Sequence, residues 1–383
     1  MLIIKGGNIH TMAGKDLEPG DIAIENSKIV SIGEKIEAKS TDEMYDASGK
    51  WVMPGIVDAH CHIGMWEDSI GFEGADGNEA TDPSTPHLRA IDAINPEDTS
   101  FREAREHGIT SVVTGPGSAN VIGGQFAALK TYGRCVDEMI IKAPAALKGA
   151  FGENPKRVYH EQKKSPSTRM ATAAIMRENF IAAQEYARKL EKASKEGKDV
   201  PDRSLKMEAI LMVLNGTIPM KVHAHRADDI LTALRIAKEF NIQITLDHCT
   251  EGHLITDLLK ENDARIIIGP HFTERSKVEL KNLSFKAAGI LEKAGLKFAM
   301  MTDHPVIPIQ YITVCAALAV REGLSEETAL RAITINAAEL TGIADQVGSL
   351  EPGKDADIAV FSGNPLDFRT KAEAVFINGK RIY

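Results

Sequence analysis

The sequence predicts an α/β fold, a TIM-type (β/α)8 barrel with a small β-sandwich module built from both termini. Strand and helix candidates alternate along the middle of the chain, a pattern that gives a parallel sheet, open or closed. The length of 383 residues suits a barrel of roughly 250 residues with a smaller module attached. We expect residues 1–52 and 343–383 to form the module and residues 53–342 to form the barrel.

Short β segments separated by turn residues stand at both ends of the chain. Residues 21–25 alternate polar and apolar side chains, and the turn at residues 26–28 leads into the strand candidate Ile29-Val-Ser-Ile. Near the other end, Asn378-Gly379 lies between apolar runs, which is a strong hairpin signal. Each set of strands is too small to fold alone, so we expect the two sets to pair with each other.

The central region contains short apolar runs with helical patterns between them. Residues 228–240 show the helical pattern most clearly, with apolar residues at 230, 231, 234 and 237 and Asn241 just beyond. The strand candidates are residues 51–57, 111–114, 220–223, 243–246, 265–268 and 298–301.

Composition excludes several classes of function. The formal net charge of -9 argues against a nucleic-acid binder, which needs Lys and Arg to neutralise phosphates. No apolar run is long enough to cross a bilayer, no signal peptide is evident, and the four cysteines form no Cys-x-x-Cys pair. We therefore expect a cytoplasmic protein that acts on a small molecule and binds neither nucleic acid nor membrane; the sequence leaves open whether it is a homo-oligomer.

Two histidines follow the first central strand candidate, in Asp58-Ala-His60-Cys-His62. Residues i and i+2 of a strand point to the same side, so both rings can reach one cation, and imidazole is a common ligand for Zn. A lone His-x-His pair is weak evidence for metal. Its place at the carboxyl end of a strand, where barrel enzymes hold their chemistry, strengthens it.

Three further candidates, His223, His248 and Asp303, follow later strand candidates. Any one of these histidines alone is more typical of a hydrogen-bonded polar loop, and Asp303 alone can be read as a helix N-cap ahead of Pro305. Their recurrence at strand ends instead predicts a metal site for hydrolysis. In such a site, Asp303 would accept the proton of the attacking water and pass it to the leaving group.

The motifs resemble those of the amidohydrolase superfamily, and within it those of the imidazolonepropionase-related and Xaa-dipeptidase-like branch. Residues 52–62 are similar to the first barrel strand of that superfamily, and residues 348–360 are similar to its return to the β module. The resemblance implies a divalent-metal hydrolase. Its implied ligands are His60 and His62 on strand 1, His223 on strand 5, His248 on strand 6 and Asp303 on strand 8.

The resemblance also implies a ligand on strand 4, where many members carry a carboxylated lysine that bridges two metals. Lys148 matches that placement, and Glu153 is the alternative carboxylate. The choice between them leaves open whether the site holds one or two ions; Zn is the expected metal.

Five other residues are candidates for contacting substrate. His225 shares the strand parity of His223, and Asn120 and Gln125 flank a Gly-rich turn whose N–H groups can line a pocket. Arg169 can bind a carboxylate bidentately, although a surface or ion-paired role is more typical, and His271 ends a strand candidate.

The predicted reaction is hydrolysis of a C–N bond in a cyclic amide, a linear amide or a peptide-like compound. One alternative is deamination on the same scaffold, but the resemblance places a Glu shortly after the strand-5 histidine of deaminases, and here Ala224, His225 and Arg226 follow His223. A second alternative is a non-catalytic metal-binding barrel. Asp303 speaks against it, because a structural site closes its coordination sphere.

Overall fold

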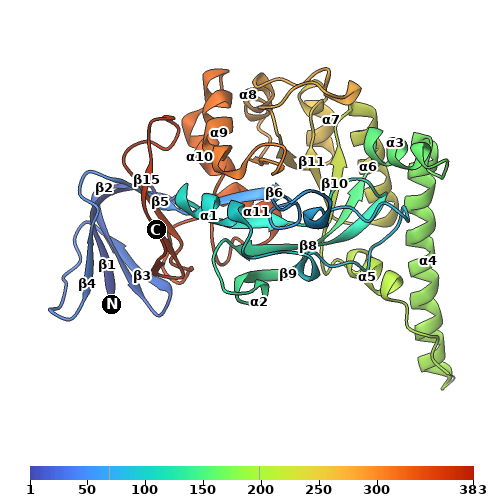
Figure 1. Ribbon diagram of the computed structural model, residues 1–383, viewed down its shortest axis with the longest axis horizontal. Coiled ribbons are helices and arrows are strands. Elements are labelled where there is room, and N and C mark those ends of the chain that lie inside the picture. Colours follow the sequence, from blue (N-terminus) through green and yellow to red (C-terminus); the bar gives the residue numbers. More distant parts are fainter. Residues whose placement is uncertain (69, 198) are drawn as a thin grey trace.

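The computed structural model describes residues 1–68, 70–197 and 199–383 and contains two eight-stranded sheets. One sheet curls into the barrel, and the other, built from strands of both chain ends, lies beside it (Figure 1). The predicted α/β barrel with a terminal β module is therefore confirmed, whereas the domain boundaries stay a prediction. Among the described residues, no helix combines the length and apolar character needed to cross a membrane.

The barrel strands follow one another in chain order around the barrel. Two backbone hydrogen bonds nearly close it: Asp303 N donates to His60 O (3.1 Å), and His62 N donates to His304 O (2.8 Å). The strands are β6 (Ile56–Cys61), β7 (Ile109–Thr114), β8 (Ile122–Lys130), β9 (Ile140–Ala150), β10 (Met220–Ala224), β11 (Ile244–His248), β12 (Arg265–Ile268) and β13 (Phe298–Met300).

The strand β8 runs antiparallel to both of its neighbours, β7 and β9, whereas the other neighbouring pairs of the barrel sheet are parallel. The connections explain this orientation. Parallel neighbours need a crossover of a dozen or more residues, but only residues 115–121 separate β7 from β8. The chain therefore turns back on itself, and the barrel has seven strands in one direction and one in the other.

Helices cover the outside of the barrel. The helix predicted at residues 228–240 is α6, and Asn241 ends it in the left-handed conformation (φ 52°). The helices are α1 (Thr99–Glu106), α2 (Val136–Met139), α3 (Glu153–Glu161), α4 (Arg169–Glu196), α5 (Leu205–Leu214), α6 (Ala227–Phe240), α7 (Thr256–Glu261), α8 (Lys286–Lys293), α9 (Ile312–Arg321), α10 (Glu326–Ala332) and α11 (Ile335–Thr341).

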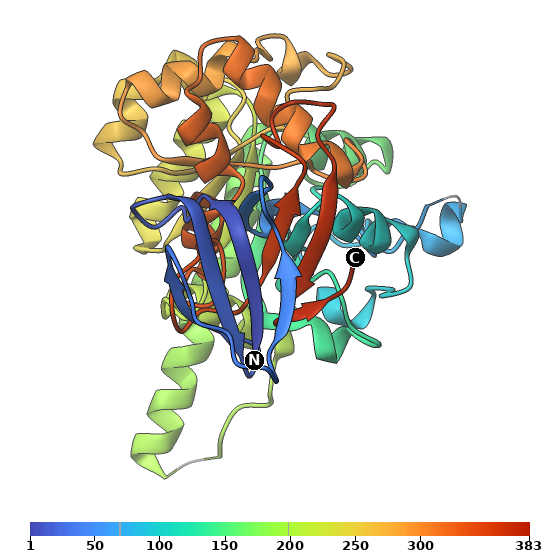
Figure 2. The ribbon, with the colours of Figure 1, turned by 90° about the vertical axis from the view of Figure 1, so that its left-hand side faces the viewer.

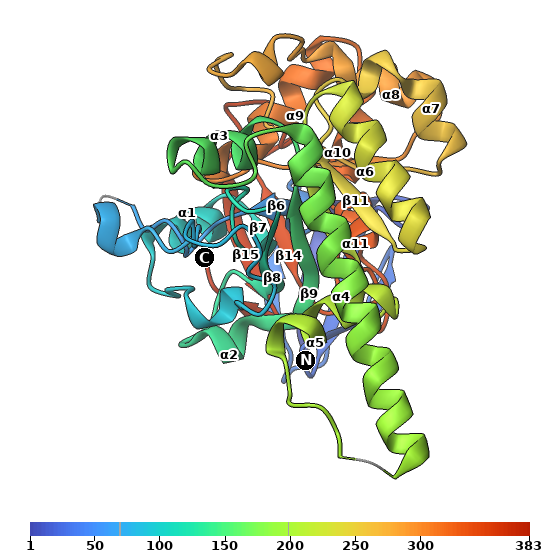
Figure 3. The same ribbon diagram turned by 90° about the vertical axis from the view of Figure 1, so that its right-hand side faces the viewer.

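The longest helix, α4, leaves the barrel in its second half (Figure 3). Its first five turns bury apolar residues such as Met176 and Phe180, whereas beyond Tyr186 the only buried residue is Ala193. Charged residues take over from that point, so the end of the helix is solvated.

The terminal sheet joins strands from the two ends of the chain: the C-terminal strands β16, β15 and β14 (red in Figure 2) lie together, and the N-terminal strands (blue) continue the sheet beyond β14. Its centre is the antiparallel pair of β5 and β14, in which Trp51 lies opposite Phe361. The strands are β1 (Leu2–Ile9), β2 (Leu17–Glu25), β3 (Lys28–Gly33), β4 (Glu43–Asp46), β5 (Trp51–Pro54), β14 (Ile358–Phe361), β15 (Ala372–Ile377) and β16 (Lys380–Arg381).

Candidate metal centre

The predicted ligands converge at the carboxyl ends of the parallel barrel strands. His60 and His62 lie at the end of β6, His223 on β10, His248 at the end of β11, and Asp303 just after β13. All five are buried. The structure therefore brings together side chains that are up to 243 positions apart in the sequence, counted from His60 to Asp303.

These side chains form two groups that could each hold a metal ion. The first comprises His60, His62 and Asp303; the Oδ1 atom of Asp303 lies 3.4 Å from His60 Nε2 and 3.1 Å from His62 Nε2. In the second group, His223, His225 and His248 bring ligand atoms within 4.8 Å of one another. The groups adjoin, because the rings of His60 and His248 have centroids 5.7 Å apart.

Contacts on the far side of the rings fix which nitrogen faces inward. His62 Nδ1 lies 2.7 Å from Gly115 O, and His248 Nδ1 lies 2.9 Å from Gly269 O. A carbonyl oxygen only accepts, so each Nδ1 must donate, and each neutral ring keeps the lone pair of Nε2 for a cation. His60 Nδ1 similarly lies 2.8 Å from the carboxylate of Asp247.

One buried nitrogen of the second group lacks a partner among the described residues: His223 Nδ1 has no hydrogen bond. A buried polar atom without a partner costs free energy unless something satisfies it. A divalent cation would do so, and imidazole and carboxylate are the donors that Zn and similar ions take. The residues therefore fit a metal.

Lys148, the strand-4 candidate, lies on β9 beside the first group. It is completely buried, and its Nζ atom is 3.4 Å from His60 Nε2. Burial lowers the pKa of Lys148 to about 8, so about a tenth of the amine is uncharged at pH 7, far more than for an exposed lysine. An uncharged amine is nucleophilic, as carboxylation requires.

Glu153, the alternative to Lys148, is the first residue of α3 and is not among the residues that line the cavity described below. Its backbone N donates to the carboxylate of Glu279 (2.9 Å). The structure thus brings Lys148, and not Glu153, next to the histidines.

Asp303 is held ionised despite its burial. Burial alone would raise the pKa of Asp303, but His248 and the close contacts of its carboxylate with the rings of His60 and His62 outweigh burial and hold this pKa well below its usual value. Its backbone also adopts the left-handed conformation, with φ of 56°. Non-glycine residues seldom adopt it, and strain of this kind concentrates at functional sites.

A cavity of about 290 Å³ opens onto both groups. Its described lining includes His62, Lys148, His223, His225, His248 and Asp303, and Trp66, Asn78, Ser118, Asn154 and Lys277 contribute to its walls. His225, expected to contact substrate, therefore faces the cavity as well as belonging to the second metal-compatible group. Its Nδ1 atom lies 2.7 Å from Thr250 Oγ1.

Asn120 and Gln125 do not line this cavity but fasten the insert at residues 71–96 to the barrel. Asn120 Nδ2 donates to Glu79 O (2.8 Å), and Gln125 Nε2 donates to Pro86 O (3.2 Å). Asn120 lies just before β8 and Gln125 lies on it, and the reversed direction of this strand places both beside the insert.

Arg169 and His271 also lie outside the cavity lining. Arg169 opens α4 and forms an ion pair with Asp229, with Nε 3.0 Å from Oδ1. His271 is buried near Phe285, with ring centroids 6.2 Å apart, and burial lowers its pKa to about 4. The guanidinium of Arg169 thus binds a carboxylate of the protein itself, that of Asp229.

Four charged residues near the site were not singled out from the sequence. Asp247 contacts His60 and, at 3.3 Å, the buried Lys221. Glu279 Oε1 lies 3.8 Å from His223 Nε2 and 3.7 Å from His225 Nε2, and Lys277 lines the cavity. The sequence indicated Asp247, because this residue directly precedes the predicted ligand His248 on a strand. No sequence pattern indicated the other three residues.

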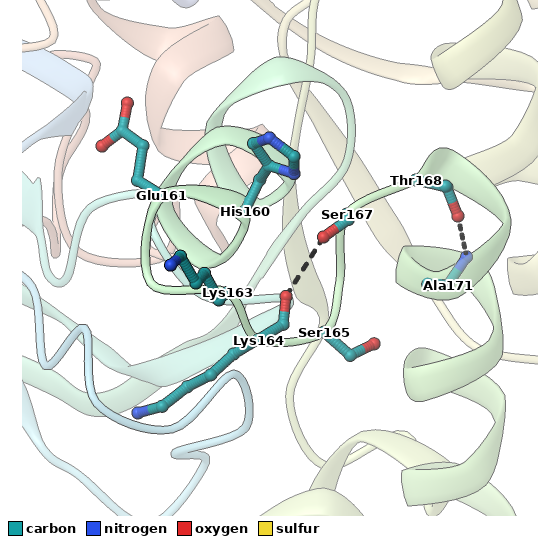
Figure 4. A pocket seen from close by; sticks show the side chains of 8 residues that line it. All are labelled: His160, Glu161, Lys163, Lys164, Ser165, Ser167, Thr168 and Ala171. Carbon is teal, nitrogen blue, oxygen red and sulfur yellow. Dashed lines mark hydrogen bonds between the residues drawn. The ribbon is translucent and has the colours of Figure 1, made fainter.

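A larger hollow of about 760 Å³ lies elsewhere, between α3 and the start of α4 (Figure 4). Lys163, Lys164, Ser165 and Ser167 line it, and its hydrogen bonds, such as that from Ala171 N to Thr168 Oγ1, belong to the local turn and the helix cap. It contains none of the clustered histidines, so the smaller cavity is the candidate site.

We expect the metal-free protein to lose stability as the pH falls below about 6.5. Burial lowers the pKa of His225 to about 3 and that of His304 to about 4, and it lowers the pKa of His60, His223 and His248 as well. Below that pH, these histidines bind protons in the unfolded chain but not in the folded chain. The free energy of unfolding therefore falls by roughly 1.4 kcal/mol per group for each pH unit.

The carboxyl group of Asp58 has the opposite effect on stability, because burial raises its pKa to about 7 and the folded chain then gains stability as the pH falls. The histidines outnumber this one group, so the net effect of acid is a loss of stability. Thermal unfolding of chelator-treated protein should show a midpoint that is nearly constant between about pH 8 and pH 7 and then falls. A midpoint that stays constant or rises down to about pH 5.5 would contradict the burial of neutral histidines.

A protein-family model described as the amidohydrolase family matches residues 51–382. The amidohydrolase tasK of Hapsidospora irregularis is 29% identical to this chain, over 94% of this chain and 39% of that protein. An adenine deaminase of Listeria monocytogenes is 25% identical, over 93% of this chain and 53% of that protein. The chain therefore spans about half or less of the length of these two relatives.

An imidazolonepropionase of Geobacillus kaustophilus is 27% identical, over 90% of this chain and 84% of that protein. Among solved structures, an amidohydrolase of Thermotoga maritima is 45% identical over the whole of both chains, with a TM-score of 0.97. A Xaa-Pro dipeptidase with bound methionine shares 16% identity over 99% of each chain, with a TM-score of 0.59, which is a likeness of fold alone. These relatives confirm the resemblance found in the sequence.

Proposed function

The chain belongs to the amidohydrolase family, and from this premise we propose that it hydrolyses the C–N bond of a small amide, cyclic amide or peptide-like compound at a divalent-metal centre. The observation that carries the proposal is the convergence of buried imidazoles with Asp303 at the wall of one cavity. Barrel enzymes hold their chemistry at this end of the strands.

The proposed metal is Zn, bound as two ions. His60, His62 and Asp303 would hold one ion, and His223 with His248 the other. Lys148 would contribute a further ligand to this centre once its amine has added to carbon dioxide, forming an N–C bond and releasing a proton to give a carbamate. The carbamate supplies the negative charge that two close cations require.

When bound, the metal lowers the pKa of a water molecule and polarises the substrate carbonyl. The chain's own part is to position and move protons. Asp303 is ionised and lines the cavity, so it can accept a proton from the attacking water and return it to the departing nitrogen. Asp247 and the carbonyls of Gly115 and Gly269 keep the histidine rings oriented.

The adenine deaminase relatives make deamination the second candidate. Glu279 is the one observation in its favour, because its carboxylate lies near His223 and His225 although the residues after His223 include no Glu. Its other oxygen accepts from Glu153 N, and Glu279 is not among the residues that line the cavity. Amide hydrolysis therefore remains the better-supported function.

The proposal is tested by metal analysis coupled to a substrate screen. Purified protein is expected to contain Zn and, when reloaded with Zn after chelation, to release amine from N-acyl amino acids, dipeptides or cyclic amides. Adenine and adenosine, with ammonia as the measured product, test deamination in parallel. Ammonia release without any amide cleavage would replace the proposed reaction by the second candidate.

A further inference from the structure

The walls of the cavity carry one charged group that the proposed chemistry does not use. Among the described lining residues, Lys148 and Lys277 are the basic side chains other than histidines. Lys148 lies against His60 and is assigned to the metal centre. Lys277 comes from the loop after β12, whereas Lys148 lies on β9, and Lys277 has no role in the proposed hydrolysis.

A neutral side chain, and not a carboxylate, holds the ammonium of Lys277. Its Nζ atom donates to Asn154 Oδ1 at 2.8 Å, and Asn154 Nδ2 in turn donates to Ser118 Oγ at 2.8 Å. Within residues 1–68, 70–197 and 199–383, no ion pair of Lys277 is found within 4.0 Å. An ammonium has three N–H donors, so donors remain for a ligand.

The positive charge of Lys277 acts on the histidines of the second group. Asn154 links them, because its Nδ2 atom is 3.4 Å from His223 Nε2. After burial and other charges, Lys277 is among the causes that lower the pKa of His223 and His225. A substrate that reaches the histidines therefore lies within the field of this cation.

We infer that the substrate bears a carboxylate that pairs with Lys277 while its scissile C–N bond lies at the histidines. This inference rests on the proposed hydrolase function and narrows its substrates to small carboxylate-bearing amides, such as N-acyl amino acids and dipeptides. The cavity of about 290 Å³ is at the small end of ligand sites, which suits this size. A single ammonium acts as a point charge and suits a singly charged carboxylate.

The test compares matched compounds with and without the carboxylate. N-acetyl amino acids and the corresponding N-acetyl amino alcohols share the scissile bond and differ in the charged group. For the Zn-loaded protein we expect kcat/KM to favour the acids about 10- to 100-fold, the range of a charge-assisted hydrogen bond. Lys277→Met should abolish this preference, mainly through KM, and Lys277→Arg should keep most of it.

Lys281→Met is the matched control, because Lys281 is an exposed lysine of the same loop region and is not a cavity-lining residue. It should behave as the wild type. Equal turnover of acids and alcohols by the wild type, or an unchanged preference in Lys277→Met, would overturn the inference and leave the hydrolase proposal standing.

Calorimetric titration of the same Zn-loaded proteins with these compounds separates the two proposals. If none is hydrolysed but the acids bind more tightly than the alcohols in a Lys277-dependent way, the hydrolase proposal fails and the carboxylate site is retained. If the acids show no tighter binding, the carboxylate site fails as well.

Discussion

Replacing Asp303 with Asn is expected to lower kcat by about 10³- to 10⁴-fold while metal stays bound. The substitution keeps the size of the side chain and an oxygen that can contact a cation, but it removes the group that accepts the proton. His60, His62, His223 and His248 remain to hold the metal. The loss should therefore appear in kcat far more than in metal content.

The measurement is a steady-state assay of Asp303→Asn on the best compound of the screen, together with its metal content. Asp257→Asn makes the same chemical change at an exposed position of α7 and should leave turnover unchanged. Near-normal turnover in Asp303→Asn would remove the proposed role of this carboxylate. Loss of metal together with turnover would make Asp303 chiefly a ligand.

Replacing Lys148 with Ala is expected to lower metal content from two ions to one and turnover by at least about 10²-fold. In the proposed centre, a carbamate on this lysine would supply a negatively charged ligand that Ala cannot replace. Because Lys148 is completely buried at the cavity wall, its removal leaves space beside His60. Added acetate or propionate should enter that space and restore part of the activity.

Glu153→Gln is the matched control for this experiment, because Glu153 was the other candidate for the strand-4 position. It should retain both ions and full turnover, since Glu153 is not part of the cavity lining. The opposite pattern, with metal lost in Glu153→Gln and retained in Lys148→Ala, would reverse the assignment. Metal analysis by mass spectrometry with parallel assays distinguishes the two results.

The metal ligands could be predicted because their signals are local. His60 and His62 are two residues apart, the spacing that puts side chains on the same side of a strand. The carboxyl ends of the barrel strands lie at one end of the barrel, and this does not depend on the conformation of the loops. Glu279 and Lys277 could not be predicted in this way. Both belong to the irregular segment after β12, whose path depends on packing against distant loops rather than on a repeating pattern.

The substrate-facing candidates of the Gly-rich turn show a second limit of the sequence. Asn120 and Gln125 were expected at the pocket because they accompany a Gly-rich turn whose N–H groups can line one. The short connection reverses β8 instead, and these side chains bind the insert. The length of a connection thus decides strand direction, a signal that apolar periodicity does not carry.

The pairing of β5 with β14 has a consequence for biosynthesis. Trp51 is made early and its partner Phe361 late, so the ribosome must add the whole barrel before this pair of strands can form. At ordinary translation speeds, the edge of β5 stays open for on the order of tens of seconds. Non-local pairing of this kind slows folding and leaves a strand edge exposed to wrong pairing while the chain is being made.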